Sequence, residues 1–335
     1  MSSKLLLATV TLASSFILHP SSFADDLPTF EDFRRIDRTR RLLGQLQTAE
    51  LLAVNQIDTK LILRKVQANS NDVRVVWGAA ELVVLWPQKQ QMFEAAMRLS
   101  SNSVPVTIRY ACAAARQGES ELALRLARFG QEHDSDNTVP WLIELWVLSS
   151  KKQPPQFATA PASAPTVFRD YSSEASEARI RLLEKAGYSA YAARRLGFKP
   201  DSEALQIAKD LCRPPLAEPA KPLLQESAGY LQHRRQFLLC ELVGQTIERT
   251  LFALRADADR SVEVRIRTGE MEKRRDELKQ LLADMERNTV DYATEKQMVQ
   301  YFDDLISLGE EDAMRSLAAV VRRPAPESSG GAPGN

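Results

Sequence analysis

Cysteine and histidine are scarce in this chain of 335 residues, which holds three of each. No Cys-x-x-Cys pair and no His-Glu-x-x-His string occurs, so the ligand spacings of common zinc sites are missing. The sequence also lacks the glycine-rich phosphate loop and the serine elbow of hydrolases. We therefore expect no metal, no cofactor and no catalytic activity.

An excess of charge of either sign is also lacking, because 44 Lys and Arg are balanced by 44 Asp and Glu. Nucleic-acid binding needs a concentrated positive field, so we do not expect a nucleic acid as partner. The longest apolar run, from Leu5 to Leu18, is shorter than the roughly 20 residues that span a bilayer. We predict no transmembrane span in the mature chain.

The same apolar run has the features of a cleaved secretory signal. Lys4 precedes it, a proline at position 20 ends it, and Ser22 and Ala24 are the small residues that signal peptidase reads. No cysteine follows that could carry a lipid anchor. We predict that residues 1–24 are a signal peptide and that the protein is exported, to the periplasm or as a secreted protein. An uncleaved membrane anchor is the alternative.

Glycine is sparse as well, with 13 residues, and apolar positions rarely alternate with polar ones. Both observations argue against β-strands, so the predicted class is all-α. Hydrophobic residues make up 44% of the chain, which is enough to bury one or two cores. The odd number of cysteines leaves at least one thiol unpaired in a monomer, and we expect no internal disulfide.

What the sequence does contain is a repeated pattern over residues 70–150. The segment SNSVP at 101–105 returns as DNTVP at 136–140, 35 residues later. A looser form, SNDV at 70–73, opens another apolar run. Self-similarity at this period is typical of helical repeat proteins.

Each repeat is predicted to form two antiparallel helices. Ser103 and Thr138 can cap the first helix, and a proline two residues later loses no hydrogen bond in a first turn. Gly118 can adopt the left-handed conformation that ends a helix. The apolar stripe over 122–129 then predicts the second helix.

These residues resemble the tetratricopeptide repeat (TPR) family. With a unit that begins at Val104, Gly118 falls on the family's inter-helix glycine and Ala123 on the small residue of its second helix. The next unit places Trp141 on the family's first-helix tryptophan. Four positions depart from the family pattern: Thr107, Ala114, Ala127 and Ser135. The resemblance implies antiparallel helical hairpins stacked as an α-solenoid.

The resemblance also implies a function and a site. A TPR-like protein of this kind is expected to be a non-catalytic scaffold that binds a protein or peptide on the surface formed by the first helix of each pair. Mapped onto this chain, that surface holds Ile108, Cys112, Arg116, Leu142 and Trp146. We expect Trp146 to be partly exposed there. The alternative for these residues is packing between hairpins.

Composition divides the rest of the chain. Residues 25–152 are predicted as an N-terminal helical-repeat domain, 153–170 as a Pro/Ala-rich linker, 171–323 as a C-terminal helical domain and 324–335 as a disordered tail. Within the C-terminal domain we predict one long helix over 223–255, a charged surface helix over 260–287 and a final hairpin that turns at Gly309.

Other functions stay open on the sequence. Arg34, Arg38 and Arg41 recur on one face of a predicted helix and could bind anionic headgroups or cell-wall polymer. A solvated face neutralised by neighbouring acids is the simpler explanation. Homodimerisation through the heptad-like helix at 260–287 and an enzyme site built from distant helices are further alternatives.

Overall fold

The computed structural model describes residues 27–43, 57–101, 103–151, 165–200, 202–213, 218–234, 237–254, 261–288 and 292–321. All helices and strands within these ranges are α-helices, fifteen in number, and the β-structure there is limited to one isolated bridge between Asn137 and Val167. The all-α prediction is confirmed. The predicted signal peptide and tail, and residues 153–164 of the predicted linker, lie outside the described residues.

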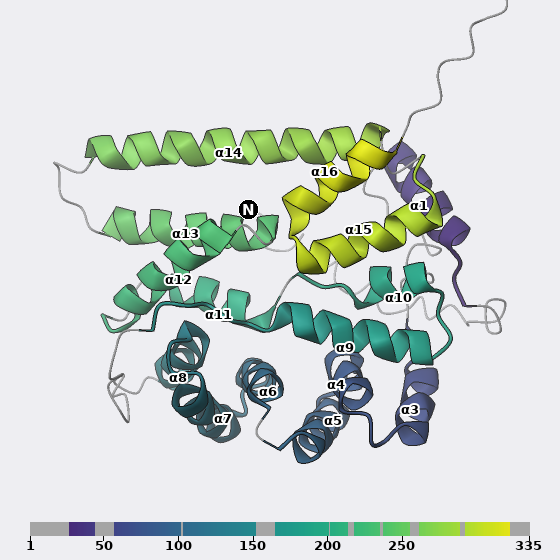
Figure 1. Ribbon diagram of the computed structural model, residues 1–335. Coiled ribbons are helices and arrows are strands. Elements are labelled where there is room, and N and C mark those ends of the chain that lie inside the picture. The colour runs from purple at the N-terminus through teal and green to yellow at the C-terminus, as the bar shows by residue number, and fades with distance from the viewer. Residues whose placement is uncertain are drawn as a thin grey trace, which may run out of the picture.

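Six helices follow one another as a row along the lower part of Figure 1. They are α3 (Thr59–Ala68), α4 (Val73–Leu82), α5 (Trp86–Leu99), α6 (Val104–Arg116), α7 (Ser120–His133) and α8 (Thr138–Ser150). Consecutive helices of the row pack against one another from α3 to α8. This row contains the whole repeated part of the sequence.

The turn between α6 and α7 forms as its sequence predicts. Gly118 has a φ of 83°, its amide donates to the Ala115 carbonyl, and the Glu119 amide donates to the Ala114 carbonyl. This pair of hydrogen bonds is the Schellman arrangement, which satisfies carbonyls at a helix end and needs a left-handed residue. The prediction that Gly118 ends the first helix is confirmed.

The caps that begin α6 and α8 differ from the prediction. Ser103 precedes α6 without a side-chain hydrogen bond to its first turn. At α8 the capping residue is Asn137, whose Oδ1 accepts from the Val139 amide at 3.1 Å, while Thr138 is already helical. The Oδ1 of Asn137 also accepts a hydrogen bond from the Arg169 amide of the returning chain. This second bond explains why Asn137, and not Thr138, is the capping residue.

The second half of the chain forms the upper part of Figure 1. Its helices are α9 (Ser172–Lys185), α10 (Ala190–Gly197), α11 (Glu203–Leu211), α12 (Ala220–Arg234), α13 (Leu238–Leu254), α14 (Ser261–Asn288), α15 (Glu295–Ser307) and α16 (Glu310–Val320). The N-terminal helix α1 (Phe30–Leu43) joins this half, because Phe30 and Phe33 pack edge-on against Tyr191 of α10.

The predicted single helix over 223–255 is wrong. The chain forms two helices there, α12 and α13, which pack closely against each other. A Cβ on Gly244 of α13 would lie 3.0 Å from the Ala228 carbonyl oxygen of α12. The sequence between the two helices contains neither glycine nor proline, the residues that usually mark a turn. The spacing of apolar residues therefore predicts a single helix over this segment.

The second half covers one face of the row. Helix α9 packs on α3 and α4, α11 packs on α6 and α8, and α12 packs on α8. In Figure 1, α9 and α11 lie above the row, along its upper side. The approach is closest at Gly78, where a Cβ would lie 2.3 Å from the Ala178 carbonyl oxygen. One continuous apolar core therefore runs through both predicted domains.

Candidate functional site

Three of the five residues assigned to the partner-binding surface lie inside the protein. Ile108, Cys112 and Leu142 are at most 1% exposed and belong to the apolar core. They come from α6 and α8, the two row helices on which α11 packs. Burial also raises the pKa of the Cys112 thiol, so this side chain is not a nucleophile. These three residues therefore pack in the core, which was the alternative to a binding surface.

The other two residues, Arg116 and Trp146, meet at the surface. The guanidinium of Arg116, at the end of α6, lies 5.9 Å from the ring centroid of Trp146, in the middle of α8. Trp146 is half-buried, and the Arg116 side chain is 39% exposed. Arg116 Nη1 also donates to Asp210 Oδ2 of α11 at 2.6 Å. Three helices thus build a small aromatic and charged surface, the Arg116–Trp146 surface.

A buried ionic cluster also joins the two halves of the chain. Both oxygens of Glu81 accept from Arg109, at 2.9 and 2.6 Å, and Glu81 Oε2 also accepts from Arg179 Nη1 at 3.3 Å. Burial alone would raise the pKa of Glu81, but attraction and hydrogen bonds from Arg109, with help from Arg179, lower it to about 2. Trp77 Nε1 is a fourth donor to this carboxylate. A carboxylate that is held ionised by four donors is a structural group and not a general base.

One sign of this cluster is visible in the sequence, although the cluster was not predicted. Glu81 interrupts the otherwise apolar segment GAAELVVLW, where an acid is costly unless a cation meets it. Its partners come from residues 28 and 98 positions away. Only the fold shows that they are Arg109 and Arg179.

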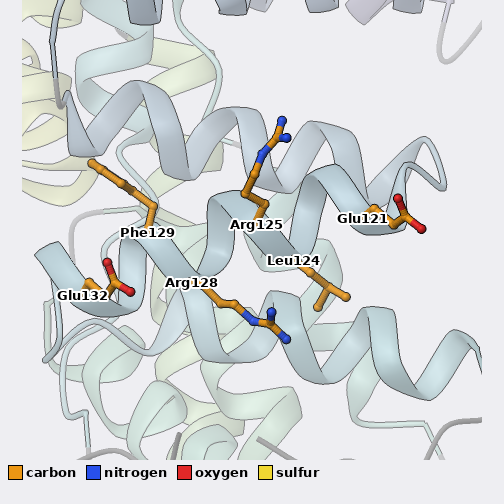
Figure 2. Close-up of a pocket in the computed structure, with 6 residues that line it drawn as sticks. All are labelled: Glu121, Leu124, Arg125, Arg128, Phe129 and Glu132. Atoms are coloured by element: carbon orange, nitrogen blue, oxygen red, sulfur yellow. The ribbon is translucent and has the colours of Figure 1, made fainter. Parts of the chain in front are cut away.

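A depression of about 460 Å³ opens on the outer face of α7. Six residues of this one helix line it, as Figure 2 shows: Glu121, Leu124, Arg125, Arg128, Phe129 and Glu132. The four charged side chains are exposed, whereas Leu124 and Phe129 are half-buried. This α7 groove is not among the sites that the sequence analysis singled out.

The α7 groove has supports beneath and beside it. Arg128 Nε lies 3.6 Å from Oε1 of Glu144 on α8, a carboxylate that is only 1% exposed. Gln131 donates to the other oxygen of Glu144 at 2.7 Å. The Phe129 ring stacks on the imidazole of His133, with ring centroids 3.9 Å apart. These contacts restrict the orientation of Arg128 and Phe129.

Acidic side chains accompany the predicted arginine stripe on α1 along the part that can be described. Arg34 lies 5.8 Å from the Phe30 ring centroid and 3.5 Å from a Glu31 oxygen. Arg38 is exposed, and the side chain of Arg41 lies outside the described residues. On the same helix, Asp37 accepts from Arg195 of α10 at 2.7 Å. The stripe is therefore part of a mixed-charge surface.

Among the described residues, no cluster of three or more His, Cys, Asp or Glu is arranged to hold a metal ion, and no helix has the length and apolarity to cross a membrane. All three cysteines are free. Burial raises the pKa of Cys212 to about 12, which leaves its thiol protonated at neutral pH.

Comparison with known proteins adds no relative from which a function could be transferred. No family model matches the chain, and neither a curated protein nor a solved structure matches it.

Proposed function

We propose that the protein is an exported, non-catalytic scaffold that binds a protein or peptide partner, and that α3 to α8 form a TPR-like solenoid of antiparallel hairpins. The sequential packing of these helices and the Schellman turn at Gly118 support the hairpin arrangement. The apolar run and small residues before position 25 support export. The saturated carboxylate of Glu81 and the buried, protonated thiol of Cys112 support a non-catalytic role.

The Arg116–Trp146 surface is the observation that carries the proposal. In a TPR-like arrangement the first helix of each pair would face the partner, but α9, α11 and α12 occupy most of that side. Arg116 and Trp146 remain accessible at its edge. Tryptophan and arginine are among the side chains that most often dominate binding energies at interfaces. A partner carboxylate at this edge would compete with Asp210 for Arg116.

Site-specific photo-crosslinking in cells tests this proposal. A photoreactive phenylalanine analogue at position 146 should give a discrete adduct that mass spectrometry identifies, and Arg116→Ala should weaken it. The same analogue at Ile266, an exposed position on α14, serves as the control. If position 146 yields only the adducts of position 266, the Arg116–Trp146 surface does not bind a partner.

A further inference from the structure

We propose that the α7 groove is a docking surface for an acidic peptide segment of a partner protein, in which an Asp or Glu side chain is flanked by apolar residues. This inference rests on the proposed scaffold function but concerns a different surface from Arg116–Trp146. The partner chemistry follows from the charges, the supports and the apolar walls of the groove.

The charges form a stripe that is positive in the middle. Glu121, Arg125, Arg128 and Glu132 are spaced i, i+4, i+7 and i+11, so they lie on one face of the helix. Figure 2 shows the two guanidinium groups pointing to opposite sides of α7 and the two carboxylates at opposite ends. The acids are about 16 Å apart along the axis, and the arginines between them only about 4.5 Å.

Most of these charges are not neutralised within the protein. Among the side chains that the structure describes, Glu121, Arg125 and Glu132 form no hydrogen bond or ion pair. Arg128 has its one ion-pair contact at Nε, with Glu144. Both Nη groups of Arg128 and the whole guanidinium of Arg125 are therefore available as donors. A carboxylate that reaches either guanidinium would gain charge-assisted hydrogen bonds.

Two of the lining groups are already oriented for binding. The buried Glu144 carboxylate holds Arg128 from below, and Gln131 fixes that carboxylate by its hydrogen bond. Stacking on His133 holds the Phe129 ring, and His133 Nδ1 is 2.9 Å from the Phe129 carbonyl oxygen. Side chains that lose little freedom on binding contribute more net affinity.

Leu124 and Phe129 supply the apolar part of the surface, on the two sides of the charged stripe. The depression of about 460 Å³ is open to solvent, as an interacting peptide requires. A purely apolar segment would cover the guanidinium groups without pairing them, which costs free energy. A basic segment would meet two arginines at the centre. An acidic residue with apolar neighbours fits both features.

Selection from a random peptide library displayed on phage tests the inference, with the folded mature protein as the target. Enriched peptides should share an Asp or Glu next to large apolar residues. The binding of the best peptide, measured by fluorescence anisotropy, should fall by about tenfold or more in R125E and R128E. A version of the peptide with Gln or Asn in place of its acid should lose affinity similarly. The variants E121Q and E132Q are the matched controls and should bind at least as well as the wild type.

The outcomes separate this inference from the proposed function. Failure to enrich peptides, enrichment of peptides without an acid, or binding that R125E and R128E leave unchanged would overturn the α7 assignment. Peptides lost on Trp146→Ala but retained by R125E would overturn it too, while they would support the Arg116–Trp146 surface. Circular dichroism of each variant shows whether the fold is intact, and Arg125→Gln gives a milder test should R125E not fold.

Discussion

Gly78 offers a sharp test of how the second half of the chain is seated on the row. In the interior of a helix, glycine to alanine ordinarily stabilises by about 1 kcal/mol, because alanine restricts the unfolded chain and favours the helix. At Gly78 the new Cβ would lie 2.3 Å from the Ala178 carbonyl oxygen and 2.7 Å from its carbon. Backbone atoms cannot rotate away, so α4 and α9 must separate.

The cost of that separation can be bounded. Overpacking of a dense core costs typically about 1–3 kcal/mol, and here the neighbouring side chains Val75, Ala79 and Ala175 are fully buried and lose contact together. The loss outweighs the helix-propensity gain, so Gly78→Ala should lower the free energy of unfolding by about 1–2 kcal/mol or more.

Urea denaturation followed by far-UV circular dichroism measures this effect, with Gly229→Ala as the matched control. Gly229 is also in a helix, α12, but a Cβ there would meet nothing within 4 Å. That variant should be as stable as the wild type or up to about 1 kcal/mol more stable. If Gly78→Ala stabilises the protein as Gly229→Ala does, α9 does not approach α4 as described.

Further predictions concern charge, pH, the turn and export. Glu81→Gln leaves two buried arginines without their shared counter-charge and should lower the free energy of unfolding in urea by about 3–5 kcal/mol. Arg181→Gln, at an exposed ion pair, should lower it by less than about 1 kcal/mol. Equal losses in the two variants would contradict the cluster. The pKa of Glu81 is about 2 in the folded protein, against about 4.3 for an unfolded glutamate. The stabilisation by Glu81 is therefore present above the unfolded pKa and is lost as the pH falls towards 2. Unfolding measured at graded pH should show that Glu81→Gln is less sensitive to acid than the wild type. Gly118→Val should lower stability by about 1 kcal/mol or more because φ there is positive, and an unchanged melting temperature would speak against this. Mass spectrometry of the mature protein should find cleavage after Ala24, and retention of Met1 would refute the signal peptide.

Local features of this fold could be predicted from the sequence. The glycine at 118 marks its turn because few other residues adopt a positive φ, and Gly309 marks the final turn in the same way, with a φ of 96°. The helix stripes of α6 and α7 also follow from spacing alone. Such signals act within a few residues, so one sequence is sufficient to show them.

Pairings between distant segments could not be predicted. Helix α11, which packs on both α6 and α8, follows the predicted linker, and its apolar stripe does not say which helices it covers. For that reason the same residues fitted a binding surface and a core equally well. The α7 groove was missed because charges of both signs on an exposed helix are usual, and only the depression and the contact of Arg128 with the buried Glu144 set it apart.

The order of the chain has a consequence for biogenesis. The helices that cover α4, α6 and α8 are encoded after them, so the apolar face of the row stays open until the chain has emerged as far as residue 234. Until then the face is uncovered, and collapse or aggregation competes with folding. A product truncated before α9 would keep the face open permanently. The order in which the helices are made therefore sets how long this apolar face is exposed.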